Sequence, residues 1–238
     1  MDLKLSGRTV LVTGASKGIG LSAAQWFARE GCQLRLAARS RELLEREADA
    51  IRNRSHVGVS TYALDLSLEA ARKELADACP EVDILVNNAG DIPAGSLEDI
   101  DNAAWRAGWD LKVFGYIDLT RYYLSRMKAR RSGVIINIIG SAGDRPSAGY
   151  LAGSVGNAAL MAFTRAIGAE SPEYNVRVLG VNPGPVMTER VVKLAKKSAA
   201  QKLGDASRYG EMMKSYPFGR PASCDEVSAM VVSRGRPA

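Results

Sequence analysis

The chain has few of the side chains from which metal centres are built, with one histidine and three cysteines among its 238 residues. Cys32, Cys79 and Cys224 lie far apart in the sequence and show no metal-ligand spacing. His56 alone cannot form a histidine-based metal site or a serine–histidine pair. We therefore expect no metal, and we interpret these four residues as structural.

Long hydrophobic runs and dense blocks of one charge are also lacking. No stretch reaches the apolar length of a membrane span, and the N-terminus shows no basic-then-apolar signal segment. The formal net charge is +6, but the basic residues are spread over predicted helices and form neither a tail nor a dense patch. We expect a soluble cytoplasmic protein that binds neither a membrane nor nucleic acid.

Short apolar runs alternate with longer segments of helical period. The strand-like runs are TVLVTG, CQLRLAA, GVSTYAL, VDILVNN, GVIINII and VRVLGVN. The helical segments are 18–30, 41–53, 68–78, 102–130 and 150–170. This alternation predicts one α/β domain over residues 1–238, with a doubly wound parallel sheet, helices on both faces and a ligand site at the carboxyl ends of the strands.

Residues 187–216 form a long, charged segment of helical period. They stand where a mobile lid over a ligand site is expected, so the segment is a candidate substrate lid within the domain. A solvated pair of surface helices explains the same pattern equally well.

A glycine-rich turn, LVTGASKGIG, joins the first predicted strand to the first helix. Gly14, Gly18 and Gly20 permit a tight turn and a close approach of the backbone to a phosphate. The N–H groups and dipole of the following helix attract an anion. The turn therefore predicts a bound dinucleotide.

Further motifs follow in a fixed order along the chain. They are TGASKGIG (13–20), DL (65–66), NNAG (87–90), INI (136–138) and NPGPVMT (182–188). In these motifs the sequence resembles a classical short-chain dehydrogenase/reductase. The resemblance implies a Rossmann-type fold, hydride transfer between a nicotinamide cofactor and a small carbonyl or alcohol substrate, and a homo-oligomer, either a dimer or a tetramer.

The same resemblance implies which residues line the cofactor. Asp65 is expected beside the adenine, and residues 183–188 at the nicotinamide carboxamide. Asn87, Ala89 and Gly90 are expected along the cofactor. The complete implied set is Gly14, Ser16, Lys17, Gly18, Ile19, Gly20, Asp65, Leu66, Asn87, Ala89, Gly90, Pro183, Gly184, Val186 and Thr188.

The segment after the second strand, LAARS, favours NADP(H) over NAD(H). Arg39 and Ser40 stand where an NAD-preferring enzyme usually offers a carboxylate to the ribose hydroxyls. Lys17 adds a second cation from the glycine-rich turn. Arg39 and Lys17 are expected to bind the 2′-phosphate through charge-assisted hydrogen bonds.

The catalytic positions of the resembled family are substituted in this chain. Counting from flanking motifs places the family's Ser, Tyr, Lys and Asn at Gly140, Gly153, Asn157 and Lys112. An alternative count that takes Tyr150 as the family's Tyr displaces the downstream segment within a helix, which changes the buried face. We therefore prefer the first count.

The substitutions suggest a relocated site, because the Asn position has become Lys and the Lys position has become Asn. In this hypothesis Tyr150 is the proton donor, Lys112 lowers its pKa, Ser141 polarises the carbonyl and Asn157 holds a proton relay. On an ideal helix Tyr150 shares a stripe with Asn157 but is displaced toward the helix N-terminus.

Each relocated residue also has a simpler interpretation. Tyr150 fits a capping or packing aromatic, Ser141 a turn residue, and Lys112 an ion-pair partner of Asp110 or Asp144. If these interpretations hold, the chain is a catalytically impaired NADP-binding module with a regulatory or assembly role.

The resemblance further implies a strand after the helical segment 225–232, where this sequence reads SRGRPA. We expect the sheet to lack that strand and to expose an edge that a partner must cover. The usual tetramer is therefore in doubt.

Overall fold

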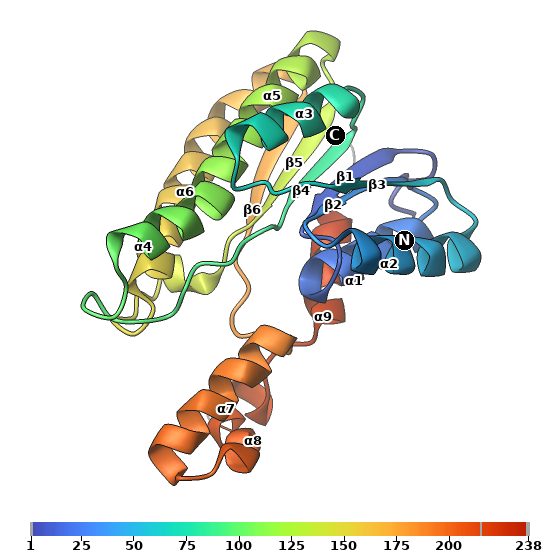
Figure 1. The fold of residues 1–238 in the computed structure, drawn as a ribbon. Helices are drawn as coiled ribbons and strands as arrows, with labels where there is room; N and C mark the ends of the chain where they lie inside the picture. The colour runs from blue at the N-terminus through green and yellow to red at the C-terminus, as the bar shows by residue number, and fades with distance from the viewer. Residues whose placement is uncertain (1, 215, 237–238) are drawn as a thin grey trace.

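The computed structural model describes residues 2–214 and 216–236, and its centre is one parallel sheet in the order β3-β2-β1-β4-β5-β6 (Figure 1). The strands are β1 (Thr9–Thr13), β2 (Gln33–Ala38), β3 (Val59–Ala63), β4 (Ile84–Asn87), β5 (Gly133–Ile138) and β6 (Val176–Val181). The order reverses between β1 and β4, which opens a crevice at their carboxyl ends. The predicted doubly wound Rossmann-type fold is confirmed.

Helices cover both faces of the sheet. They are α1 (Gly18–Arg29), α2 (Arg41–Ser55), α3 (Glu69–Ala78), α4 (Asn102–Trp109), α5 (Gly115–Arg130), α6 (Leu151–Glu170), α7 (Glu189–Leu203), α8 (Tyr209–Met213) and α9 (Cys224–Arg234). Helices α1, α2 and α9 pack on one face, and α3, α5 and α6 pack on the other (Figure 1).

The central strand shows why the apolar runs form a sheet with two covered faces. Val10 and Val12 are fully buried among the residues of α1, α2 and α9, whereas Leu11 is fully buried against the opposite face. Successive strand side chains point to opposite faces, so a strand covered on both sides reads as a continuous apolar run.

The helix predicted over 102–130 is interrupted by a π-helical turn, Asp110–Phe114, between α4 and α5. Leu111 and Val113 are buried, so the turn keeps its apolar face on the protein interior. Single π-helical turns inside α-helices occur often at functional sites. This turn carries Lys112.

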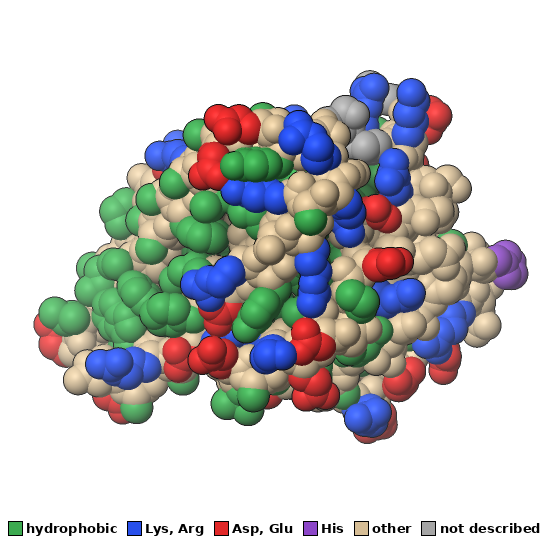
Figure 2. Space-filling model, turned by 90° about the horizontal axis from the view of Figure 1, so that it is seen from above, with side chains coloured by type: hydrophobic (Ala, Val, Ile, Leu, Met, Phe, Trp, Pro, Cys, Tyr) green, Lys and Arg blue, Asp and Glu red, His purple; other side chains and the backbone are tan. Residues whose placement is uncertain are grey.

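Helices α7 and α8 lie in the predicted lid segment and project away from the sheet (Figure 1). Strand β6 pairs with β5 alone, and through residue 236 the described chain adds no strand after α9. No helix in the described ranges is long and apolar enough to cross a membrane. On the face shown in Figure 2, basic side chains are scattered among acidic ones.

Candidate active site

The glycine-rich turn brings backbone atoms into contact at the carboxyl end of β1. Gly14 and Gly18 have φ values of +66° and +59°, which favour glycine. A Cβ atom at Gly20 would lie 2.4 Å from both the Gly14 carbonyl oxygen and the Asn88 amide nitrogen. Asn88 fixes the turn by donating hydrogen bonds to the carbonyl oxygens of Thr13 (2.9 Å) and Gly14 (3.2 Å).

The side chains of Asn87 and Asn88 have different partners, one in the sheet interior and the other in the glycine-rich turn. Asn87 is fully buried and donates to the Asn137 side-chain oxygen (2.9 Å) and the Thr120 hydroxyl (3.3 Å). Its side chain therefore stabilises the sheet interior, and only its backbone is available to the cofactor expected there. Asn88, which the sequence analysis left out, holds the turn, and its place in the same NNAG motif was the available signal.

The turn also fits a bound pyrophosphate. Lys17 precedes α1 in an extended conformation, and its side chain makes no capping hydrogen bond. The first N–H groups of α1 therefore have no side-chain acceptor from the capping residue, and the helix dipole favours an anion there. A Cβ at Gly18 would lie 3.5 Å from the Thr188 methyl carbon, so Thr188 lies beside the turn.

The predicted 2′-phosphate ligands are exposed at the crevice. The Arg39 guanidinium lies 3.5 Å from Asp91, and the Lys17 ammonium lies 3.5 Å from Glu189 at the start of α7. Both basic side chains are more than half exposed, at 61% for Arg39 and 68% for Lys17. Such exposed ion pairs are weak, so an incoming phosphate competes with them readily.

Ser40 and Asp65 both stabilise local backbone. The Ser40 hydroxyl accepts from the Leu43 N–H (3.4 Å) and caps α2. Asp65 accepts from the N–H (3.0 Å) and hydroxyl (2.8 Å) of Ser67, and the backbone bond is the main reason that its pKa is lowered. A ligand that binds Ser40 or Asp65 therefore competes with the hydrogen bonds that these side chains already make to the backbone.

The remaining predicted cofactor residues differ in burial. Leu66 and Val186 are buried at 3% and 4% exposure, so their side chains belong to the core and only their backbone is available to a ligand. Ile19 and Ala89 are partly buried against the core, and Ser16 is partly exposed.

Tyr150 has a position that the helical pattern did not predict. It precedes α6 with φ −142° and ψ 44°, so it is not part of the helix. A Cβ at Gly153 would lie 2.0 Å from the Tyr150 ring carbon Cζ and 2.5 Å from its hydroxyl. The ring therefore folds over Gly153 and fills the space of the absent side chain. The expected displacement toward the helix N-terminus is wrong for the ring.

The electrostatic surroundings of Tyr150 also differ from the expectation. Burial raises its pKa, and the charged groups acting on it are Arg190, which lowers the pKa, and Asp91, which raises it. Lys112 is not among them. The expected lowering of the Tyr150 pKa by Lys112 is therefore not found.

Lys112 and Asn157 bind consecutive carbonyl groups at the end of β5. The Lys112 ammonium donates to the Ile139 oxygen (2.5 Å), and the Asn157 amide donates to the Gly140 oxygen (3.3 Å). Lys112 and Asn157 therefore lie near each other. Burial, assisted by the charge of Arg190, lowers the pKa of Lys112 to about 7.

The other partners considered for Lys112 are not used. Asp144 lies 3.7 Å from Arg165 instead, and no ion pair of Lys112 occurs within the described ranges. The Asn157 side-chain oxygen is buried and has no hydrogen-bond partner among the described residues. A buried oxygen of this kind is available to a water or a substrate hydroxyl.

Gly140 and Ser141 connect β5 to the cofactor segment. Gly140 has φ +122°, a conformation that a serine rarely adopts, and a Cβ there would lie 3.0 Å from the Asn157 amide nitrogen. Ser141 donates its N–H to the Pro183 oxygen (2.8 Å), and its hydroxyl lies 4.0 Å from the position of a Cβ at Gly184. Ser141 therefore lies beside the predicted carboxamide segment.

Arg190 is a site residue that the sequence analysis missed. It lies in the first turn of α7, donates to the Ile92 carbonyl oxygen and lies 3.4 Å from Asp91. Its guanidinium carbon is 6.0 Å from the centre of the Tyr150 ring. No local motif marks it, because the contact joins the lid segment to a loop that is distant in the sequence.

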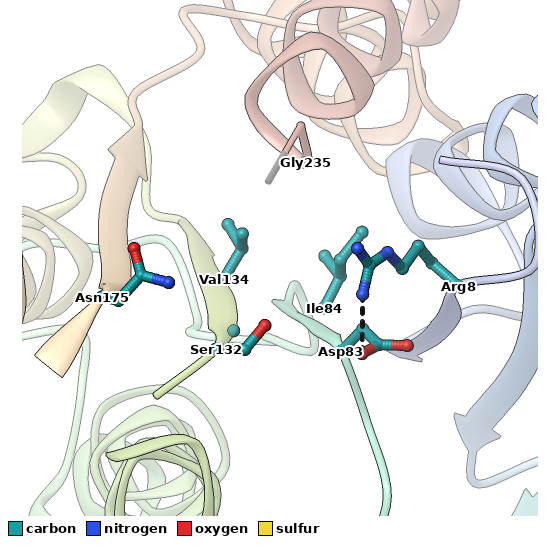
Figure 3. Close-up of a pocket in the computed structure, with 8 residues that line it drawn as sticks. Arg8, Asp83, Ile84, Ser132, Val134, Asn175 and Gly235 are labelled. Atoms are coloured by element: carbon teal, nitrogen blue, oxygen red, sulfur yellow. Dashed lines mark hydrogen bonds and ion pairs between the residues drawn. The ribbon is translucent and has the colours of Figure 1, made fainter. Parts of the chain in front are cut away.

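A polar pocket of about 220 Å³ lies at the opposite, amino-terminal end of the strands (Figure 3). Its lining includes the ion-paired Arg8 and Asp83, together with Asn175 and Gly235. No predicted site residue lines this pocket, so the crevice at the carboxyl ends remains the candidate site.

Comparisons with known proteins identify the family of this chain. Residues 8–199 match the family model for short chain dehydrogenase. Oxidoreductase UcpA of Escherichia coli (strain K12) is 32% identical over 237 residues, covering 97% of this chain and 89% of that protein.

Solved structures share the whole architecture. L-sorbose reductase from Gluconobacter frateurii, complexed with NADPH and L-sorbose, superposes with a TM-score of 0.92 at 30% identity and covers 99% of this chain and 92% of its own. An NAD+-bound xylitol dehydrogenase, with a TM-score of 0.87, 24% identity and coverage of 97% and 93%, shares the fold. The chain belongs to the short-chain dehydrogenase family, and its class is that of the NAD(P)-dependent oxidoreductases.

Proposed function

We propose that this protein is an NADP(H)-dependent oxidoreductase that interconverts a small carbonyl compound and its alcohol, with Tyr150 as the proton donor. The observation that carries the proposal is the contact between Tyr150 and Gly153. The Tyr150 hydroxyl would be 2.5 Å from a Cβ at the family's Tyr position, so a phenol is still present there.

The preference for NADP(H) rests on Arg39 and Lys17. Both are exposed cations at the crevice, held only by long ion pairs of 3.5 Å. A 2′-phosphate offers the Arg39 guanidinium a stronger, bidentate acceptor. The L-sorbose reductase of similar structure was solved with NADPH, which supports this preference.

The cofactor supplies the hydride when it is bound. The residues of the chain have to stabilise the oxyanion that develops on the substrate and to deliver a proton to it. Tyr150 donates that proton, the Ser141 hydroxyl polarises the carbonyl, and the buried Asn157 oxygen accepts a hydrogen bond from a relay water. Tyr150 then regains a proton from that water, and Lys112, whose pKa is near 7, supplies a proton to the water in turn.

A second candidate is an NADP-binding module without hydride transfer. Burial raises the pKa of Tyr150, and the cation expected to lower it points to the Ile139 carbonyl instead. Such a module binds the cofactor and uses its occupancy in regulation or assembly. The homo-oligomer and the lid remain predictions.

Steady-state assays with NADPH and a panel of ketones, ketoses including L-sorbose, and acyl thioesters separate the two candidates. The oxidoreductase predicts NADPH consumption with at least one substrate and a loss of about 10²–10⁴-fold in kcat for Tyr150→Phe at unchanged NADPH affinity. NADPH binding without turnover favours the module. Turnover that survives Tyr150→Phe contradicts the role of Tyr150.

A further inference from the structure

Arg190 belongs to the projecting helix α7, but its guanidinium lies against the loop that follows β4. It donates to the carbonyl oxygen of Ile92 and lies 3.4 Å from Asp91, both in the loop that follows β4. Its side chain is 39% exposed, which is less than the 65% of Asp91. The N-terminal turn of α7 is thus attached to the cofactor crevice through this one side chain and through the Lys17–Glu189 pair.

The same guanidinium is the permanent positive charge next to Tyr150. Its carbon is 6.0 Å from the centre of the Tyr150 ring, within the range of a cation–π contact. An arginine keeps its charge at every working pH, whereas burial and Arg190 itself favour the neutral form of Lys112. A fixed cation favours the charge that develops on a phenol as it gives up its proton.

Asp91 is shared between Arg190 and the predicted 2′-phosphate ligand. One carboxylate oxygen lies 3.4 Å from Arg190 and the other 3.5 Å from Arg39. Arg39 follows β2 and Asp91 follows β4, and these strands flank β1, so the pair spans the carboxyl end of β1. A phosphate that engages Arg39 removes it from Asp91 and leaves the carboxylate to Arg190 alone.

We propose that Arg190 is a positioning residue for Tyr150, and that Asp91 links its placement to the 2′-phosphate bound at Arg39. This inference rests on the proposed function, because it takes Tyr150 as the proton donor and Arg39 as the phosphate ligand. Bound NADP(H) then also holds the first turn of α7 in place, because Asp91 pairs with Arg190 alone. NAD(H) leaves Asp91 shared and Arg190 less firmly held.

Hydrogen exchange tests the link through Asp91 without any turnover. We expect NADP+ to protect the amides of residues 189–203 more than NAD+ does at equal fractional saturation, and Asp91→Asn to remove the difference. Asp77→Asn is the matched control, because Asp77 is an exposed carboxylate on α3 that is also shared by two cations, Lys73 and Arg126. Equal protection by both nucleotides in the parent protein, or a difference that survives Asp91→Asn, overturns the link.

Kinetics test the positioning role. Arg190→Met is expected to lower kcat about 10- to 100-fold while the Kd for NADPH stays within about twofold, and Arg190→Lys is expected to recover part of the loss. A weaker Kd with unchanged kcat, or an Arg190→Lys variant no better than Arg190→Met, contradicts the role. If the parent protein shows no turnover, the proposed function is contradicted. The hydrogen-exchange experiment then still tests the link through Asp91. Failure of NADP+ to bind defeats both.

Discussion

At the scale of single residues, we propose that the catalytic position has lost its tyrosine at Gly153 and that Tyr150 supplies a phenol in its place. Gly153 leaves a space in the first turn of α6, and the Tyr150 ring fills it from outside the helix. A side chain in a helix leans toward its own N-terminus, but a residue before the helix is free to fold forward over the first turn. The absence of a side chain at Gly153 therefore makes room for the Tyr150 ring, and the ring fills the space that the glycine leaves.

Gly153→Ala is predicted to displace Tyr150, because the new Cβ meets the ring at 2.0 Å. Alanine is favoured over glycine inside a helix by about 1 kcal/mol, so α6 itself gains stability. We expect kcat to fall by about 10²-fold or more. Gly210→Ala in α8, where a Cβ meets open space, is the control, and full activity of Gly153→Ala contradicts the contact.

Lys112 is predicted to make the stability of the protein dependent on pH. Burial holds its pKa in the folded state at about 7, below the usual value of 10.5, so the unfolded state binds more protons at this side chain between these values. The contribution of Lys112 to the free energy of unfolding therefore rises with pH across this window. Lys112→Met is expected to remove this pH dependence and to stabilise the protein below pH 7. Each unit by which the pKa is lowered corresponds to about 1.4 kcal/mol at most, so the expected gain in the free energy of unfolding is a few kcal/mol. Parallel urea-melt profiles for the two proteins across this window contradict the prediction.

At the scale of elements, the site depends on where strands and helices end. The π-helical turn Asp110–Phe114 directs Lys112 to the end of β5, and the start of α7 carries Arg190 to the loop after β4. Neither feature changes the apolar pattern of its helix. Both determine which charge lies next to Tyr150.

Thr188→Ala is predicted to loosen the start of α7. The Thr188 hydroxyl caps this helix by accepting from the Val191 N–H at 3.3 Å. Loss of such a cap costs about 1 kcal/mol. We expect faster hydrogen exchange of the first amides of α7, with the rest of the fold unaffected. Ser223→Ala removes the equivalent cap of α9 and is expected to leave α7 unchanged.

The sequence was sufficient to predict the sheet but not the placement of side chains at the site. Residues 9–13 are a short continuous apolar run, and the alternation of such runs with helical segments is typical of a parallel sheet that is covered on both faces. Tyr150 and Arg190 depend on contacts between segments distant in the sequence, or on a residue outside its helix. The sequence also could not separate the roles of the Asn87 and Asn88 side chains, because the two adjacent asparagines point to different surroundings.

At the scale of the whole molecule, the crevice lies between the two halves of the sheet, and ion pairs from both sides meet across it. Arg39 comes from the half with β2, and Asp91 from the half with β4. A cofactor that binds between these halves stabilises the folded state by mass action. The size of that stabilisation reports on cofactor selectivity without any substrate.

Arg39→Asp is predicted to reverse the selectivity. In the parent protein, NADP+ at about 100 times its Kd raises the free energy of unfolding by about 2.7 kcal/mol, and NAD+ at the same concentration raises it by less. In Arg39→Asp the carboxylate repels the 2′-phosphate, so NAD+ should raise Tm more than NADP+. Arg46→Asp, with the same charge change at an exposed residue of α2, is expected to keep the parent order. An unchanged order in Arg39→Asp refutes the phosphate assignment.

The central claim, that Tyr150 takes the place of the tyrosine absent at Gly153, is tested most directly by a crystal structure of the protein with NADP+ and the alcohol product. The account predicts the Tyr150 hydroxyl within hydrogen-bond reach of the product oxygen, roughly 2.6–3.2 Å, with the Arg190 guanidinium still over the ring. A Tyr150 hydroxyl that points away from the nicotinamide, with the product oxygen bound by other groups, would contradict it.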